Sequence, residues 1–123
     1  MPLIILVSVL FLSLFTTGCS AGGIGKYGQP IANRNITAIK DVLASPKAYE
    51  GKIVTIDGKI ANECSTGCWF FVKVNEGDLS IYVDTGKSGF AIPQHVGRKV
   101  LVEGVVVNKK SGIMIQAKGV EVR

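Results

Sequence analysis

The sequence contains few of the residues from which most catalytic sites are built. Its 123 residues include one histidine, one tryptophan, two methionines and three cysteines. No set of serine, histidine and aspartate has a spacing that suits nucleophilic catalysis, and no glycine-rich loop follows a strand to bind phosphate. No two carboxylates can be placed facing a common cleft. We therefore expect the protein not to be an enzyme.

The shortage of histidine also limits the metal sites that the chain could form. Zinc usually takes four ligands, whereas the chain offers His95 in a turn-rich connector and Met114 in an apolar segment. We expect His95 to be a solvated loop residue and Met114 to be a packing residue. Because Trp69 and not histidine follows Cys68, the c-type haem motif is absent as well. No cofactor is expected, with a soft metal ion bound by cysteine as the one exception.

One long apolar run is present, at residues 3–15, and small residues follow it. The run is shorter than the ~20 residues that span a bilayer, and the pattern is typical of a signal peptide. The stretch Thr16-Thr17-Gly18-Cys19 resembles the lipobox of bacterial lipoproteins, although Thr16 replaces the usual leucine and no basic residue precedes the run. The resemblance implies a signal peptide at residues 1–18, lipidation of Cys19 and export to a membrane surface, periplasmic or extracellular. An ordinary secretory signal and an uncleaved anchor are the alternatives.

The rest of the chain is mildly basic, and it begins with a segment that is expected to lack regular structure. Fourteen lysines and arginines against nine acidic residues give a net charge of +5, which permits contact with anionic lipids without requiring it. Residues 19–35 are rich in glycine and polar residues and predict a flexible tether. The domain is expected at residues 36–123. Thr37 is a candidate N-cap for a short helix, and Ser45-Pro46 marks a second helical turn.

Most of the domain has the pattern of β-strands. Apolar and polar residues alternate in five segments, residues 52–60, 69–74, 79–84, 98–107 and 113–122. The connector between the third and fourth segments, residues 85–97, has room for one short helical turn around Pro93-Gln94-His95-Val96. Five short strands with this connector predict an all-β domain with a small α lead-in, folded as a five-stranded Greek-key barrel.

The strand pattern resembles that of the OB-fold over residues 52–122. The matching stretches are Val54-x-Ile56-x-Gly58-x-Ile60, Phe71-Val72-x-Val74, Ile81-x-Val83 and Gly97-x-x-Val100-x-Val102-x-Gly104-x-Val106. Cys64-x-x-x-Cys68-Trp69, with Tyr27-Gly28-Gln29-Pro30-Ile31, is similar to small exported OB-like lipoprotein domains of bacteria. These resemblances imply an OB-like barrel and assign no activity.

Two cysteines flank the expected turn between the first and second strands. Cβ atoms across such a turn approach to ~4.5–5.5 Å, which is close to what a disulfide requires. Because exported proteins meet an oxidising environment, a disulfide between Cys64 and Cys68 is the first expectation. The alternatives are a dithiol that binds copper(I) or another soft ion, and a site for thiol exchange. The neighbouring Glu63 is expected to raise a thiol pKa, which argues against a reactive thiolate.

An aromatic and basic surface is predicted next to this turn. The two-residue period of a strand places Trp69, Phe71 and Lys73 on the outside of the second strand. Tyr82 is expected outside on the third strand, beside them. These four residues are a candidate ligand-binding face, in the position that OB domains commonly use. In the alternatives, the lead-in helix covers the aromatic rings, or the rings stack on single-stranded nucleic acid.

The expected function is a membrane-tethered, non-enzymatic binding module of the cell envelope, with an unknown protein or small molecule as its partner. Nucleic acid is the less expected partner, because the chain carries an export signal and only a modest net charge.

Overall fold

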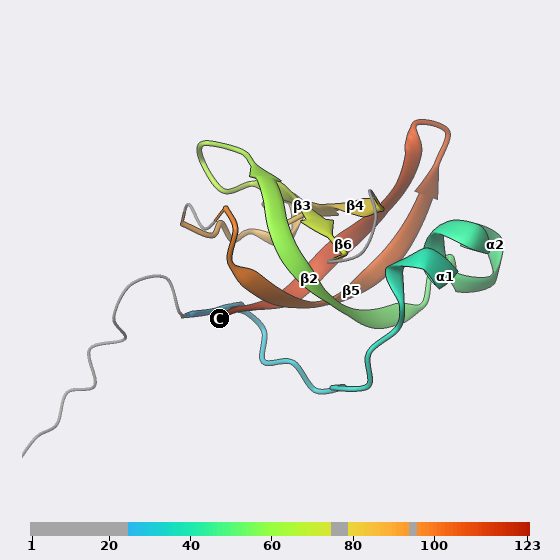
Figure 1. Cartoon of the computed structure of the whole chain (residues 1–123), viewed down its shortest axis with the longest axis horizontal. Helices are drawn as coiled ribbons and strands as arrows, with labels where there is room; N and C mark the ends of the chain where they lie inside the picture. The colour runs from blue at the N-terminus through green and yellow to red at the C-terminus, as the bar shows by residue number, and fades with distance from the viewer. Residues whose placement is uncertain (1–24, 75–78, 94–95) are drawn as a thin grey trace, which may run out of the picture.

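The computed structural model describes residues 25–74, 79–93 and 96–123. The elements, in chain order, are β1 (Gly25–Gly28), α1 (Ile39–Ala44), α2 (Pro46–Tyr49), β2 (Ile53–Glu63), β3 (Trp69–Lys73), β4 (Ser80–Asp84), the 3₁₀ turn η1 (Gly86–Ser88), β5 (Lys99–Lys109) and β6 (Gly112–Val122). The domain is mostly β with short helices, which confirms the predicted fold class (Figure 1). The predicted signal peptide, Cys19 and His95 lie outside the described residues.

Strands β2 to β6 form a closed five-stranded barrel. Their order is β2-β3-β4-β6-β5, and β5 pairs with β2 to complete the circle. The β4–β6 pairing is parallel, whereas the other pairings among these strands are antiparallel. Because β4 lies beside β6 rather than β5, the chain must cross over after its third barrel strand. The predicted OB-like Greek-key barrel is therefore confirmed.

The barrel interior is filled by alternate side chains from every strand. Phe70 and Val72 of β3 are fully buried, and so are Ile81 and Val83 of β4, as the two-residue period predicts. Branched aliphatic side chains supply most of the remaining core, which suits strands with one face turned inward. The intervening residues of β3 and β4 therefore point outward, where they are available for a binding site.

The two short helices lie together at one end of the barrel (Figure 1). Ile39 and Val42 of α1 are buried in the barrel core, and Leu43 and Tyr49 pack against that core. The N-cap residue of α1 is Ala38 rather than the predicted Thr37, and it makes no side-chain capping bond. The helix is thus held by its apolar face. The outer aromatic residues of β3 and β4 are not among the side chains of this core cluster, on which α1 packs.

The segment predicted to be a flexible tether is ordered from Gly25 onward, which corrects that prediction. Residues 25–28 form a sixth strand, β1, that pairs antiparallel with the end of β6. Ile31 is buried, and Gln29 donates its backbone N–H to the carbonyl of Lys118 at 2.8 Å. This strand was not expected, because its glycines lower the strand propensity of the segment. Pairing with β6 supplies the missing stability.

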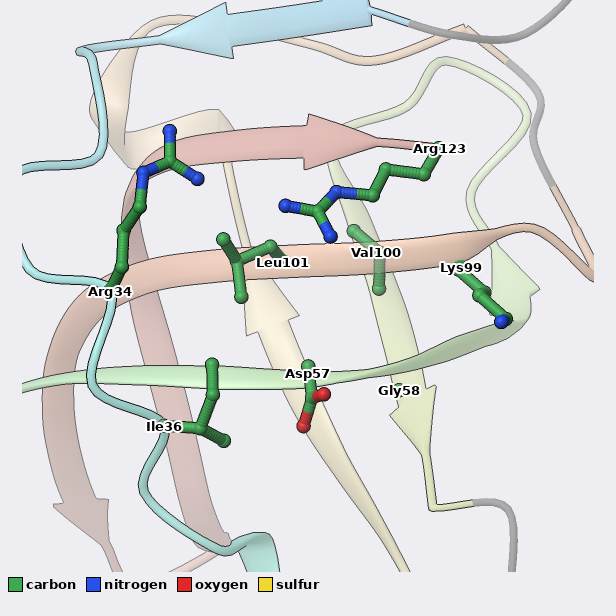
Figure 2. Close-up of a pocket in the computed structure, with 8 residues that line it drawn as sticks. All are labelled: Arg34, Ile36, Asp57, Gly58, Lys99, Val100, Leu101 and Arg123. Carbon is green, nitrogen blue, oxygen red and sulfur yellow. The ribbon is translucent and has the colours of Figure 1, made fainter.

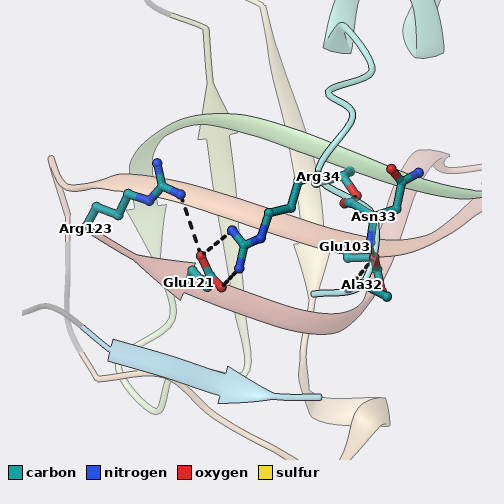
Figure 3. Close-up of polar contacts among 7 residues, drawn as sticks. Ala32, Asn33, Arg34, Glu103, Glu121 and Arg123 are labelled. Carbon is teal, nitrogen blue, oxygen red and sulfur yellow. Dashed lines mark hydrogen bonds and ion pairs between the residues drawn. The ribbon is translucent and has the colours of Figure 1, made fainter. Parts of the chain in front are cut away.

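Two buried glutamates hold the next part of the chain to the barrel (Figure 3). One carboxylate oxygen of Glu103 accepts the backbone N–H groups of Ala32 and Asn33, at 3.2 and 2.9 Å. Arg34 donates two hydrogen bonds to the carboxylate of Glu121, at 3.1 and 2.6 Å. We call these contacts the polar latch. A buried carboxylate requires such partners. The latch therefore explains how Glu103 and Glu121 can be buried, and it holds residues 29–37 against the barrel.

Candidate functional site

Three aromatic rings lie together on the outside of the barrel. Trp69 and Tyr82 are stacked, with ring centroids 5.8 Å apart and an interplanar angle of 25°. Phe71 meets both of them edge to face, with centroid distances of 6.0 Å to Trp69 and 5.4 Å to Tyr82. The register of β3 against β4 produces this arrangement, because Phe71 is directly opposite Tyr82. All three side chains are half-buried. We call them the aromatic face.

Lys73 extends the aromatic face at one end, as the sequence predicted. It is exposed, and it lies opposite Ser80 on β4 and Lys59 on β2. Lys59 is in turn opposite Lys99 on β5, so three lysines lie in register across neighbouring strands. Like charges in direct opposition weaken strand pairing. We call Lys59, Lys73 and Lys99 the basic row. It borders the aromatic face at Lys73 and concentrates positive charge on this part of the barrel.

At the other end of the aromatic face the two cysteines meet. Their Sγ atoms are 3.0 Å apart, within hydrogen-bond distance, and both residues are present as half-exposed thiols. The hydroxyl of Thr66 lies 3.2 Å from the Sγ of Cys64 and 3.4 Å from the Sγ of Cys68. The sequence predicted that Cys64 and Cys68 lie close together, but it did not single out Thr66. We call residues 64–68 the thiol turn.

The thiol turn is tied to the connector that follows β4. The carbonyl oxygen of Cys68 accepts the backbone N–H groups of Thr85 and Gly86, each at 3.0 Å. The carbonyl oxygen of Gly67 accepts the buried hydroxyl of Thr85 at 2.8 Å and the N–H of Ile92 at 3.2 Å. Gly67 has φ = 72°, and a Cβ added there would lie 1.9 Å from the carbonyl oxygen of Ile92. Only glycine fits at this position.

Hydrogen bonding changes the acidity of the first cysteine. The Cys68 thiol donates to the Sγ of Cys64, and this bond, followed by bonds from Thr66, lowers the pKa of Cys64 from 9.0 to about 6. The net shift is opposite in direction to the raised thiol pKa that was expected from Glu63. Bonds to a thiolate favour the charged form, and here they come from residues within the turn itself. These bonds therefore favour the thiolate form of Cys64.

An acidic residue that the sequence did not single out lies beside these groups. Asp84 is directly opposite Trp69, and its Oδ1 accepts the N–H of Gly86 at 3.2 Å. Its Oδ2 is buried, with no hydrogen-bond partner among the described residues. Burial, followed by the charges of Asp84 and the two cysteines, raises the pKa of Tyr82. Tyr82 therefore keeps its phenolic proton and can act as a donor to a ligand.

A separate hollow lies beneath the polar latch, between residues 34–36 and the start of β5 (Figure 2). Its volume is about 350 Å³, and Arg34, Lys99 and Arg123 lie around it, with Asp57 projecting from β2. Arg34 is already paired with Glu121, and Arg123 lies 3.7 Å from the same carboxylate. Because these pairs use much of the positive charge, the hollow is a weaker candidate for an anion site than its arginines suggest.

The described residues hold no group of three or more histidine, cysteine, aspartate or glutamate side chains that could bind a metal ion. Among the same residues, no helix has the length and apolar character needed to cross a membrane.

Comparison with known proteins identifies the fold and no family. No family model matches the sequence, and no curated protein matches it either. Among solved structures, the chain is similar to the hypothetical protein ygiW from E. coli, with a TM-score of 0.51, 18% sequence identity, and coverage of 80% of this chain and 99% of that one. It is also similar to a putative aspartyl-tRNA synthetase from Leishmania major Friedlin, with a TM-score of 0.54 and 15% identity. That match covers 77% of this chain and 23% of the other. Both likenesses support an OB-like barrel and nothing more specific.

Proposed function

We propose that this protein is a membrane-tethered, non-enzymatic binding module of the cell envelope, and that the aromatic face binds a polypeptide partner. The observation that carries the proposal is the cluster of Trp69, Phe71 and Tyr82 outside the barrel core. Large aromatic side chains dominate the energetics of protein interfaces. Three aromatic side chains on the outer face of the strands are not used to fill the core, so their apolar surface is available to stabilise a complex with a partner.

The surroundings of the aromatic face favour a polypeptide over other ligands. Lys73 lies at one end and Asp84 beside Trp69, so both signs of charge flank the rings. A mixed polar rim around an apolar centre is typical of a protein interface. Proteins that bind single-stranded nucleic acid instead line the whole groove with positive charge. The likeness to a tRNA synthetase concerns the fold, and it does not favour RNA as the ligand.

The tether and the basic row support attachment to a membrane. If Cys19 is lipidated, the chain from Cys19 to Gly25 reaches at most about 20 Å from the lipid. Gly25 pairs with Val122 at the end of β6, and the N–H of Arg123 donates to the carbonyl of Lys99. The same end of the sheet therefore carries the basic row, which suits an anionic membrane surface. The aromatic face would then extend away from the membrane.

The single tryptophan allows a direct test, because Trp69 is part of the proposed surface. The full chain is titrated with a panel of extended, tryptophan-free peptides that contain tyrosine and leucine. We expect a saturable change in Trp69 emission for a subset of the peptides. Phe71→Ala should weaken that binding by about tenfold or more, as expected for an interface anchor. The matched control is Ile53→Ala on β2, which removes an exposed apolar side chain from another part of the barrel. Equal losses in both variants, or no response to any peptide, would contradict the proposal.

Nucleic acid is tested in the same assay with single-stranded oligonucleotides at several salt concentrations. Binding through phosphate contacts weakens steeply as salt increases. The proposal predicts no such salt-dependent binding. Tight, salt-dependent binding that is lost in Phe71→Ala would show that the aromatic face binds nucleic acid, and it would contradict the proposal of a polypeptide partner.

Copper(I) at the thiol turn is the second candidate function, since two thiolates can hold a soft ion of low coordination number. The Sγ atoms are 3.0 Å apart, so both could reach one ion once their side chains rotate to move the sulfurs further apart. Native mass spectrometry of the full chain, with and without copper(I), distinguishes a cysteine pair that binds the ion from a pair that is closed as a disulfide. Uptake of one ion that is lost in Cys64→Ser supports the metal site. A stable disulfide with no uptake contradicts it.

A further inference from the structure

The thiol turn has a feature that the binding function does not use. Its two sulfur atoms are close enough to react with each other, and both residues are half-exposed. The Sγ atoms are 3.0 Å apart, so closure to the ~2.05 Å of a disulfide requires a movement of about 1 Å.

The turn keeps its shape without a bond between the sulfurs. Four hydrogen bonds from the connector end on the carbonyl oxygens of Gly67 and Cys68. The N–H of Cys64 also donates to the carbonyl of Trp69 at 2.9 Å, which closes the hairpin. A disulfide is therefore not needed to hold the hairpin. The pair can gain or lose a bond while the backbone around it stays in place.

We propose that Cys64 and Cys68 form a thiol–disulfide exchange site that takes an accessible disulfide of another molecule as its substrate. The direction of the hydrogen bond assigns the two roles. The Cys68 thiol donates its proton to the Sγ of Cys64, so Cys64 is the attacking sulfur and Cys68 the resolving one. The proposal goes beyond the binding function and does not depend on it.

The reaction balances with these two residues and one substrate disulfide. The Cys64 thiolate attacks one substrate sulfur, the substrate S–S bond breaks, and the departing thiolate takes up a proton. A mixed disulfide now joins Cys64 to the substrate. Cys68 then loses its proton and attacks the Sγ of Cys64, which releases the second substrate thiolate, and this takes up a proton. The pair is oxidised by two electrons to a disulfide, and the substrate disulfide is reduced to two thiols.

Charged and titratable groups face the pair from several directions. Glu63 precedes Cys64 on β2, while Asp84 and Tyr82 project from β4. With these groups around it, the pKa of Cys64 is lowered to about 6, because Cys68 and Thr66 bond to its sulfur. A thiolate present at neutral pH is the form that attacks disulfides. The geometry and the acidity of the pair therefore point to the same sulfur.

The first test measures exchange with glutathione. The full chain carries Cys19→Ser, so that Cys64 and Cys68 are its only thiols. It is equilibrated in buffers of different ratios of oxidised to reduced glutathione, quenched with acid, alkylated and analysed by mass spectrometry. We expect a reversible change between dithiol and disulfide within the accessible range of ratios, and a mixed disulfide on Cys64 that accumulates in Cys68→Ser. A pair that stays oxidised in the most reducing buffer is a structural disulfide and overturns the proposal, as does a pair that never oxidises.

The second test asks whether Cys64 is the activated sulfur. The alkylation rate of each cysteine is followed against pH by peptide mapping, and the rate of Cys64 should change with a midpoint near pH 6. Thr66→Val removes a hydroxyl that bonds to both sulfurs and should move that midpoint upward, whereas Thr66→Ser should restore it. Ser65→Ala removes the neighbouring exposed hydroxyl and serves as the matched control.

At neutral pH the gain in rate for Cys64 is expected to be only about threefold over an ordinary thiol. Against an ordinary thiol of pKa 9.0, a thiolate fraction about 90-fold larger is offset by a nucleophilicity about 30-fold lower. The position of the midpoint is therefore the more decisive readout. A midpoint for Cys64 at the ordinary value of 9.0, or equal shifts in Thr66→Val and Ser65→Ala, would overturn the assignment of the attacking sulfur.

Discussion

The polar latch and the thiol turn are both built around hydrogen-bonded ionisable groups, but they differ in burial and in the reach of their contacts. In the latch, the Glu121 side chain is 9% exposed, and it bonds to Arg34 across 87 residues of sequence. In the thiol turn, Cys64 is half-exposed and bonds to residues two and four positions away. Long-range contacts of buried groups fix the path of the chain. Short-range contacts of exposed groups tune chemistry without being needed for the fold.

This difference predicts a division of effects between the two regions. Substitutions in the latch should lower stability and leave thiol chemistry unchanged. Substitutions of thiol or aromatic side chains should change reactivity or binding with little loss of stability. Gly67 is the exception, because it joins the thiol turn to the barrel.

Among substitutions in the polar latch, the thiol turn and the aromatic face, the largest effect on stability is expected for Gly67→Ala. The new Cβ would lie 1.9 Å from the carbonyl oxygen of Ile92, and the residue has a positive φ. We expect a loss of about 3 kcal/mol in the free energy of unfolding, measured with urea. Gly89→Ala is the matched control, since Gly89 also has a positive φ (81°) but has nothing within 4 Å of the added Cβ. The control should lose only about 1 kcal/mol. Similar losses in the two variants would show that the turn is not fixed by its contact with Ile92.

Glu103→Ala should have the next largest effect. It removes the acceptor of two backbone N–H groups, those of Ala32 and Asn33, although water can replace part of the interaction because both residues are exposed. We expect a loss of about 2 kcal/mol in urea unfolding. Glu103→Gln keeps an acceptor oxygen and should lose less. The alkylation rate of Cys64 should be the same in both variants. A change in that rate would mean that the two regions are coupled, and the comparison would fail.

Acid should weaken the latch through Glu121. Arg34 bonds to this carboxylate and lowers its pKa from 4.5. A carboxyl group whose pKa is lower in the folded state contributes stability that is fully present above the unfolded pKa and is lost as pH falls toward the folded pKa. The free energy of unfolding should therefore fall as pH decreases below 4.5. Arg34→Ala should reduce this dependence and lower stability only slightly at neutral pH, because the Arg34 side chain is 53% exposed. An unchanged acid dependence in Arg34→Ala would contradict the role of the pair.

The smallest effect on stability is expected for Phe71→Ala. Its ring packs against Trp69 and Tyr82 outside the core, and such edge contacts contribute about 1 kcal/mol or less. Phe70→Ala provides the contrast on the next residue of β3, where a fully buried ring should cost about 4 kcal/mol. Thermal unfolding of the two variants would separate them clearly. A loss for Phe71→Ala as large as for Phe70→Ala would make the aromatic face part of the core.

The sequence was sufficient to predict the barrel, because alternation along β2 to β6 separates inner from outer residues. Phe70 and Phe71 are the clearest example, since neighbouring phenylalanines fall on opposite faces as the two-residue period requires. The same rule predicted that Trp69, Phe71 and Tyr82 share a face. It did not predict that Trp69 and Tyr82 stack, because that depends on register and on side-chain rotation.

Contacts between distant segments could not be predicted from the sequence. Strand β1 was missed because its two glycines give it little strand character of its own, and β6 completes its hydrogen bonds. Thr55 alternates with the core residues of β2, yet it is fully buried, and its hydroxyl donates to the carbonyl of Asn33. Thr66 and Asp84 were missed for a related reason. Thr66 matters because it lies beside the two sulfur atoms, and Asp84 matters because it lies opposite Trp69. No local sequence pattern predicts either of these positions.

The most direct test of the account is the titration of Cys64 in the full chain that carries Cys19→Ser. Thiolate absorbance is followed against pH in the presence of a reductant, with Cys64→Ser to identify the signal and Arg34→Ala to represent the latch. We predict a midpoint near pH 6 that disappears in Cys64→Ser and is unchanged in Arg34→Ala. A midpoint close to 9.0 would contradict the claim that the thiol turn holds an activated sulfur. A midpoint that moves in Arg34→Ala would contradict the claim that the two regions act independently.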